Sequence, residues 1–273
     1  MSRFKWLNLE SSHPAEKDTP PSSADVDAES LETDIADHRH LLQIAEEAYR
    51  AMLYEKALKF YSKALGVDPN LEVAWSGQLR CLLDLNENPE ALTWATKAQQ
   101  MFPKSADIIS VRALALAREG NIPDALALSD GAMKNDPIGW FSWIARGEIL
   151  ALADSGNSEF CMMKAREMMP NDWLIVLKVA QGYSRTSMKE KSVSLYKKVL
   201  SAQPDLAEAW YEMGIIQMDL GLIDDAQKCF ERAHKLIPAN RKFSNAFSET
   251  LQFGFMDKAY NWIKTFFSGA KRK

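Results

Sequence analysis

The chain has 273 residues, of which 47% are hydrophobic and 26% charged, and its formal net charge is -4. This length and mix are those of an ordinary globular protein. The acidic balance argues against a nucleic-acid-binding protein, which usually carries a basic domain.

Cysteine usage and hydropathy predict a reducing compartment. The cysteines Cys81, Cys161 and Cys229 lie far apart and have no metal-ligand spacing, so we expect buried thiols and neither disulfides nor a zinc site. Residues 1–10 lack the continuous apolar segment of a secretory signal, and no stretch approaches the roughly 18 apolar residues of a membrane span. The sequence therefore predicts a cytoplasmic protein that holds no metal or other cofactor.

Residues 1–37 form an acidic tail that contains Ser and Pro. Residues 11–34 hold few large apolar side chains, so we expect disorder, because they cannot bury enough surface to offset the entropy of ordering. Ahead of them, residues 3–9 place four bulky apolar side chains beside two cations, as a short docking peptide would: Phe4, Trp6, Leu7 and Leu9. The alternative, an N-terminal remnant without a function, stays open.

Residues 38–239 contain six prolines at a nearly constant interval. Consecutive members lie 34, 34, 33, 34 and 34 positions apart, and the residue five positions before each is mostly small. A period of this length predicts one helical hairpin repeated six times, in which each hairpin buries its apolar face against its neighbours. The prolines are Pro69, Pro103, Pro137, Pro170, Pro204 and Pro238. The fourth repeat is one residue short between Gly147 and Ser158, where we expect a tolerated loop deletion.

The sixth repeat carries the pattern most completely and resembles the tetratricopeptide repeat family. The match rests on large and small residues at fixed spacing, namely Trp210, Gly214, Ala226, Phe230, Ala233 and Pro238. The resemblance covers about three quarters of the chain. It implies an all-α fold, an α-solenoid of six helical hairpins closed by a C-terminal capping helix.

Residues 240–273 are predicted to form that cap, as one or two helices with a basic end. Aromatic residues such as Phe243 and Phe247 supply the apolar content, and a solenoid needs a terminal helix to cover its last apolar face. Attachment to a membrane surface is the alternative, because Lys264 and the cations at 271–273 lie among or after aromatic residues.

The resemblance also implies a partner-binding surface. In tetratricopeptide repeats the first helix of each hairpin lines a concave face, and contacts come mainly from its second, fifth, ninth and twelfth positions. Carried over, these positions predict a surface that is more apolar in the last three repeats, with a wet apolar groove at the fourth and fifth, although some of the side chains could instead be interhelix core. The predicted contacts are Tyr49, Arg80, Leu114, Phe141, Ile144, Leu174, Leu177, Tyr211 and Ile215.

Some chaperone-binding relatives hold a C-terminal carboxylate with a clamp of Lys, Asn and Arg. The corresponding positions here carry none of these residues, and two of them are acidic: Leu42, Glu46, Gly77, Asp107 and Val111. We therefore expect a different kind of partner.

The leading interpretation is a non-enzymatic scaffold that binds an apolar or amphipathic segment of a partner protein. An enzyme is the competing class, but no metal-binding histidine pair, glycine-rich phosphate loop or nucleophile elbow is present. The alternative is a membrane-surface or self-assembling scaffold that uses its N-terminal peptide or its C-terminal helix. Glu10 to Asp37 would span about 30 Å as a flexible chain, so residues 3–9 could reach the groove of their own chain or of a neighbouring copy.

Overall fold

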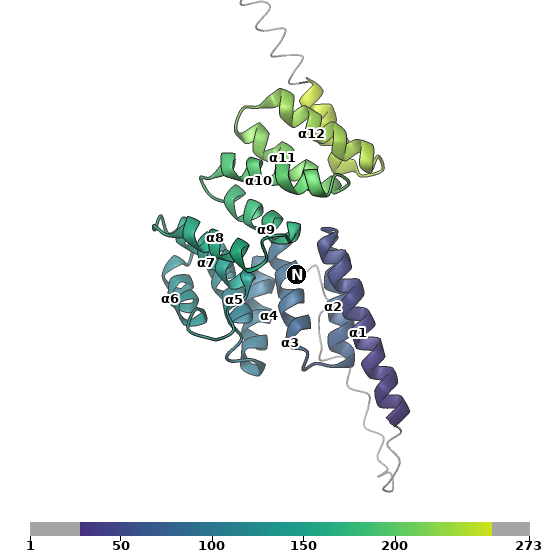
Figure 1. The fold of residues 1–273 in the computed structure, drawn as a ribbon, viewed down its shortest axis with the longest axis vertical. Coiled ribbons are helices and arrows are strands. Elements are labelled where there is room, and N and C mark those ends of the chain that lie inside the picture. The colour runs from purple at the N-terminus through teal and green to yellow at the C-terminus, as the bar shows by residue number, and fades with distance from the viewer. Residues whose placement is uncertain (1–27, 253–273) are drawn as a thin grey trace, which may run out of the picture. The chain divides into compact units, whose positions relative to one another are not determined.

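The computed structural model describes residues 28–252, and within this range every regular element is an α-helix (Figure 1). This confirms the predicted all-α solenoid of six helical hairpins. The helices are α1 (Ala28–Arg50), α2 (Tyr54–Val67), α3 (Glu72–Asp84), α4 (Asn88–Met101), α5 (Ala106–Arg118), α6 (Ile122–Ala132), α7 (Trp140–Leu152), α8 (Ser158–Met168), α9 (Trp173–Ser184), α10 (Lys189–Ala202), α11 (Ala207–Asp219) and α12 (Ile223–Leu236).

The chain divides into two compact units, Met1–Ala165 and Arg166–Lys273. The first unit contains α1 to α7 and most of α8, and the second contains α9 to α12 and a further helical segment at 241–252. The predicted docking peptide (Phe4, Trp6, Leu7 and Leu9) and residues 253–273 lie outside the described residues.

Close helix packing within the hairpins depends on glycine opposite an aromatic ring. A Cβ atom added to Gly214 on α11 would lie 2.6 Å from the Phe230 ring on α12, and one added to Gly77 on α3 would lie 2.3 Å from the Tyr61 ring on α2. Both rings are almost completely buried. The missing side chain lets the two helix axes approach, and the ring fills the space between them.

Five of the six hairpins turn through a residue with left-handed backbone geometry at the same place in the repeat. The φ angles are 59° at Met52 and Asn86, 89° at Gly120, 51° at Asp154 and 74° at Gly221. After each, the next N–H bonds back to a carbonyl of the last helical turn, as Glu87 does to Leu82 at 2.9 Å. This is a common helix ending, which satisfies carbonyls that the helix itself leaves unbonded.

The fourth hairpin differs where the sequence lacks one residue. Its second helix, α8, begins four residues after Asp154, whereas α2, α4, α6 and α12 begin two residues after their left-handed residue. Asn157 supplies a second left-handed position, with φ of 71°. A cavity of about 650 Å³ beside this turn is lined by Trp143, Asn157 and Phe160, among others.

Helix α1 corrects the boundary predicted for the N-terminal tail. It begins at Ala28, within the segment that we expected to be disordered and ahead of the predicted repeat boundary at position 38. Ala, Leu and Glu predominate at 28–32, and these residues favour helix. Extending a helix that is already formed costs less than nucleating a new one, so the later part of α1 favours helix in the residues before it.

The helical segment at 241–252 packs on the last hairpin. Phe243 is 1% exposed and forms a cluster with Ala207 on α11 and Ala233 on α12. Its ring centroid lies 5.5 Å from that of Tyr211. The segment therefore covers apolar surface that the sixth hairpin would otherwise expose.

Candidate functional site

Arg80 on α3 lies between two aromatic rings of the first unit. Its Cζ atom is 5.6 Å from the ring centroid of Tyr49 on α1 and 5.2 Å from that of Trp140 at the start of α7. A guanidinium at this distance is attracted by the ring quadrupole. Because α1, α3, α5 and α7 are the first helices of successive hairpins, we call the side that they line the first-helix face.

Two tyrosine hydroxyls fix carboxylates around this arginine. Tyr49 donates to Asp84 at 2.8 Å, and Tyr61 donates to Glu46 at 2.9 Å. Burial, and after it the neighbouring carboxylate, raises the pKa of both hydroxyls above the usual value. The hydroxyls therefore remain protonated donors that hold the carboxylates in place.

A third carboxylate, that of Asp107 on α5, accepts a 2.9 Å hydrogen bond from Ser142 on α7. Burial acts to lower the pKa of Arg80, but the surrounding groups, including Asp107 and Glu46, outweigh it, so the pKa lies above its usual value. The Nε atom of Arg80 is nevertheless buried without a hydrogen-bond partner. This side chain therefore combines a persistent charge with an unused donor.

We define the Arg80 cluster as Glu46, Tyr49, Arg80, Asp84, Asp107 and Trp140. Three carboxylates against one guanidinium give the cluster a formal charge of -2. Aromatic faces, carboxylate acceptors and arginine donors are thus brought together on one side of the first unit, a combination that suits a polar chain carrying cations.

A buried ion pair lies on the same face. Arg118 at the end of α5 forms two bonds to Glu148 on α7, of 2.7 and 3.0 Å, and its Nη1 donates to the Leu83 carbonyl on α3 at 2.8 Å. The Arg118 and Glu148 side chains are 10% and 2% exposed. Since a bidentate pair satisfies most of the donors and acceptors that it buries, it ties three first helices together.

The second unit has its own hydrogen-bonded carboxylate, that of the half-buried Glu212 on α11. Tyr196 donates to it at 2.6 Å, and Gln181 Nε2 lies 2.9 and 3.2 Å from its two oxygens. Burial raises the pKa of Glu212 by more than these hydrogen bonds lower it. The carboxylate is therefore held in place by neutral donors.

The structure brings Tyr49 and Arg80 together but buries most of the other predicted contacts. Tyr211 is half-buried against Phe230 and Phe243, and Ile215 is 41% exposed. The remaining predicted contacts are buried: Leu114 at 1%, Phe141 at 7%, Ile144 at 5%, Leu174 at 3% and Leu177 at 0%.

At the fourth and fifth repeats the side chains predicted to line the wet apolar groove are thus buried within the described residues. The first helix of a repeat packs on neighbours at both sides, so apolar side chains at its partner-facing positions can be drawn into contact with other residues. The role of the nine predicted residues in partner binding stays a prediction.

Sequence reasoning missed Trp140 and Asp84. Asp84 follows Arg80 by four positions on one helix, a spacing that places two side chains on the same face and could have pointed to it. Trp140 stands just before the predicted contact Phe141, but its approach to Arg80 joins the second and fourth hairpins. No periodicity within one repeat could reveal that approach.

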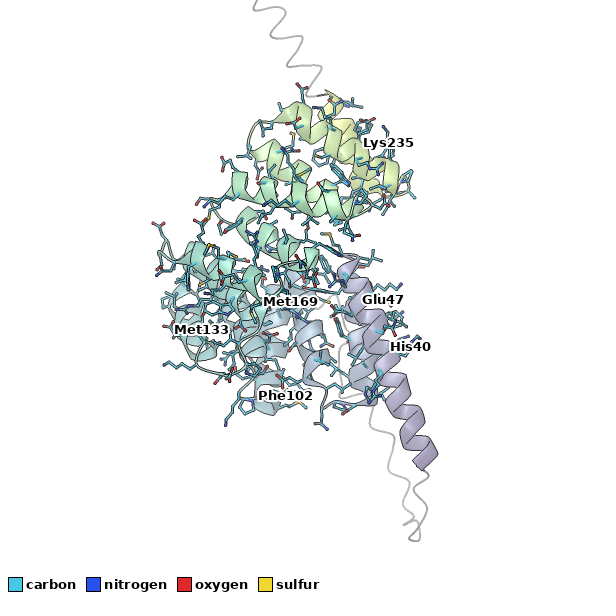
Figure 2. The ribbon with its side chains drawn as sticks, viewed as in Figure 1. His40, Glu47, Phe102, Met133, Met169 and Lys235 are labelled. Carbon is cyan, nitrogen blue, oxygen red and sulfur yellow. The ribbon has the colours of Figure 1, made fainter. Side chains whose placement is uncertain are left out.

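The described residues show neither a membrane span nor a metal site. Between residues 28 and 252 no helix is long and apolar enough to cross a membrane, and no three His, Cys, Asp or Glu side chains gather as metal ligands would. His40 and Glu47, labelled in Figure 2, are exposed on α1. The three cysteines are free and buried, as predicted.

Comparison with known proteins identifies one repeat directly. Residues 207–240, which contain α11 and α12, match the family model of the tetratricopeptide repeat. The human protein O-mannosyl-transferase TMTC3 is 26% identical over 192 residues, which are 68% of this chain and 21% of that protein. The chain thus spans about a fifth of the length of this curated relative.

Solved structures share the fold at low sequence identity. The Cut9–Hcn1 hetero-tetramer of APC/C matches with a TM-score of 0.50 and 12% identity, over 80% of this chain and 47% of that chain. A tetratricopeptide repeat protein from Parabacteroides merdae matches with a TM-score of 0.49 and 15% identity, over 82% of this chain and 89% of that chain. The chain therefore contains a tetratricopeptide repeat at residues 207–240, and the residues that the structure describes fold as helical hairpins.

Proposed function

We propose that this protein is a scaffold that holds an extended segment of a partner protein on the first-helix face of its first unit, at the Arg80 cluster. The tetratricopeptide repeat fold is in general a fold for protein–protein interaction. The observation that carries the proposal is the state of Arg80, which is held between two aromatic rings, is charged, and has a donor without a partner.

The cluster offers separate contacts to the parts of a peptide. The guanidinium of Arg80 can donate to backbone carbonyls or to a side-chain amide, and the carboxylates of Glu46 and Asp107 can accept from lysine or arginine. The half-buried Trp140 provides flat apolar area next to these polar groups. The proposed ligand is therefore a cationic segment with aromatic or apolar side chains, more polar than the sequence suggested.

The proposal is tested by comparing how the Arg80→Ala variant and a matched control variant bind the partner. Arg112→Ala removes another partly buried arginine, one that bonds Gln99 and lies outside the Arg80 cluster. Proteins retained from the native cell by the wild-type chain would be identified, and tiled peptides from them titrated against the purified variants. We expect Arg80→Ala to lose peptide binding about tenfold or more, while Arg112→Ala keeps it.

Folding of both variants is checked by circular dichroism before binding is measured. Equal peptide affinity for wild type and for folded Arg80→Ala contradicts the proposal. Loss of binding in both variants contradicts it as well, because the effect would then not be specific to the cluster.

We further propose that the role is non-enzymatic. The human relative is named as a mannosyl-transferase, but the chain spans about a fifth of it. The polar side chains of the Arg80 cluster are engaged in ring contacts and hydrogen bonds that hold the face together. Transfer of mannose to an acceptor peptide by the purified chain would overturn this part of the proposal.

A further inference from the structure

We infer that residues 3–9 of the chain itself bind the Arg80 cluster and so hold the first-helix face closed to partners. The inference rests on the proposed function, because closure matters only if this face is the partner site. It names one occupant for the site, a segment that belongs to the same chain.

Charge complementarity is the first argument. The Arg80 cluster has a formal charge of -2, whereas residues 1–9 contain two cations, Arg3 and Lys5, and no acidic side chain. The following residues, 10–27, are acidic on balance. The cationic part of the tail is therefore the part that the carboxylates of the cluster attract, and the acidic part is repelled.

The order of side chains in the segment fits the same site. In an extended chain successive side chains point to opposite sides. Arg3 and Lys5 would then face one way, toward carboxylates, while Phe4 and Trp6 face the other. The described face offers both kinds of surface, in the carboxylates around Arg80 and in the half-buried ring of Trp140.

Covalent reach allows the contact. Residues 10–27 can span at most roughly 60 Å when fully extended. Glu46 lies 18 positions after Ala28 on the same helix, a distance of about 27 Å along its axis. A tethered segment of this length acts at an effective concentration near the millimolar range, so even weak binding would keep the face occupied.

Competition by a free peptide tests the inference in the full-length chain. The probe is a fluorescein-labelled synthetic peptide with the sequence of residues 2–10. The opened variant carries Arg3→Glu, Lys5→Glu and Trp6→Ala, and the control carries Lys17→Glu, a charge change outside the segment. We expect the probe to bind the opened variant about tenfold or more tightly than the wild type or the control, because the tethered segment no longer competes.

A second change locates the binding. Glu46→Gln in the opened variant keeps an acceptor for Tyr61 while it removes one negative charge, and we expect it to weaken probe binding several-fold. Equal probe affinity for wild type and opened variant overturns the inference, as does the absence of binding to the opened variant. A wild-type dimer that becomes monomeric in the opened variant, measured by light scattering, overturns it too, because the segment would then bind a second copy.

The two proposals fail separately. If Arg80→Ala abolishes partner binding but the probe never binds, the partner site stands and its closure by residues 3–9 falls. If the probe binds the opened variant but partner binding ignores Arg80, the proposed function falls, and with it the regulatory meaning of the contact.

Discussion

The hydroxyl of Tyr49 on α1 donates to Asp84 on α3 across 35 positions of the sequence. Ser142 bonds Asp107, and Arg118 bonds the Leu83 carbonyl, at the same separation. Each of these bonds joins the first helices of two consecutive hairpins. The first-helix face of the first unit is therefore held together by polar bonds at a nearly constant interval, in addition to apolar packing.

Tyr49→Phe should lower the free energy of unfolding by about 1.5–3 kcal/mol, because it removes a hydrogen bond to a charged group. Urea denaturation followed by circular dichroism measures the change. The control is Tyr211→Phe, since within residues 28–252 the Tyr211 hydroxyl has no hydrogen-bond partner. The control should change stability by less than about 0.5 kcal/mol, and equal losses in both variants would contradict the prediction.

Glu148→Ala should cost about 3–5 kcal/mol of unfolding free energy, because it leaves the buried Arg118 charge without its carboxylate. The comparison is Lys189→Ala, which breaks a solvent-exposed pair with Asp219 and should cost less than about 1 kcal/mol. Equilibrium unfolding in urea checks both variants. A loss below about 1 kcal/mol for Glu148→Ala would show that the ion pair does not stabilise the face.

Gly120 and Gly131 are predicted to respond in opposite directions to alanine. A Cβ atom meets nothing within 4 Å at either position, but Gly120 has φ of 89° whereas Gly131 lies within α6. Gly120→Ala should destabilise the protein by about 1–2 kcal/mol through backbone strain, and Gly131→Ala should stabilise it by up to about 1 kcal/mol. Thermal unfolding of the two variants side by side decides the signs, and a shared sign is the contrary result.

Gly214→Ala should destabilise the sixth hairpin by about 1–3 kcal/mol, because the new methyl group would overlap the Phe230 ring. The double variant Gly214→Ala with Phe230→Leu supplies the control. A smaller side chain on α12 makes room for the methyl group, so the glycine change should cost less in that background. A double-mutant cycle in urea measures the coupling, and additive effects would exclude the proposed contact.

Glu212→Gln should gain stability relative to wild type as the pH rises from 4 to 7. The pKa of Glu212 is raised in the folded state, mainly by burial, with Glu208 adding to the increase and Arg185 opposing it. The folded state therefore binds the proton more tightly than the unfolded chain. The resulting stabilisation is complete below the unfolded value of about 4.5 and is lost as the pH rises through the folded pKa.

Glutamine cannot ionise, so the stability of the Glu212→Gln variant does not fall with this deprotonation as the pH rises. The difference in unfolding free energy, variant minus wild type, should thus be more positive at pH 7 than at pH 4 in urea titrations. A difference that stays constant over this range would show that the carboxylate does not titrate in this way.

The repeat architecture could be predicted because it depends on local and periodic signals. A proline at a nearly constant interval and small residues such as Gly214 opposite large ones such as Phe230 specify close helix pairs within one repeat. The start of α1 was placed too late, because the composition of residues 28–37 indicated only a lack of apolar surface. It did not show that a stable helix could extend over them.

The candidate site was predictable only in part. Tyr49 and Arg80 occupy positions that the family resemblance marks, and each could be found by counting within its own repeat. Trp140 approaches Arg80 from two hairpins away, and this contact depends on how successive hairpins stack. The burial of Phe141 and Ile144 has the same origin, since a helical position alone does not tell which neighbour covers it.

Because five hairpins share the left-handed turn, one of these repeats could be exchanged for another without a change in the backbone geometry of the turn. Four of its positions, from Met52 through Asn86 and Gly120 to Asp154, are separated by 34 residues and leave the helix with the same backbone exit. If one hairpin were duplicated or deleted between two of these turns, the new junction would have the same backbone geometry as the original one. The fifth hairpin lacks the left-handed residue, so array length should be easiest to change within the first unit.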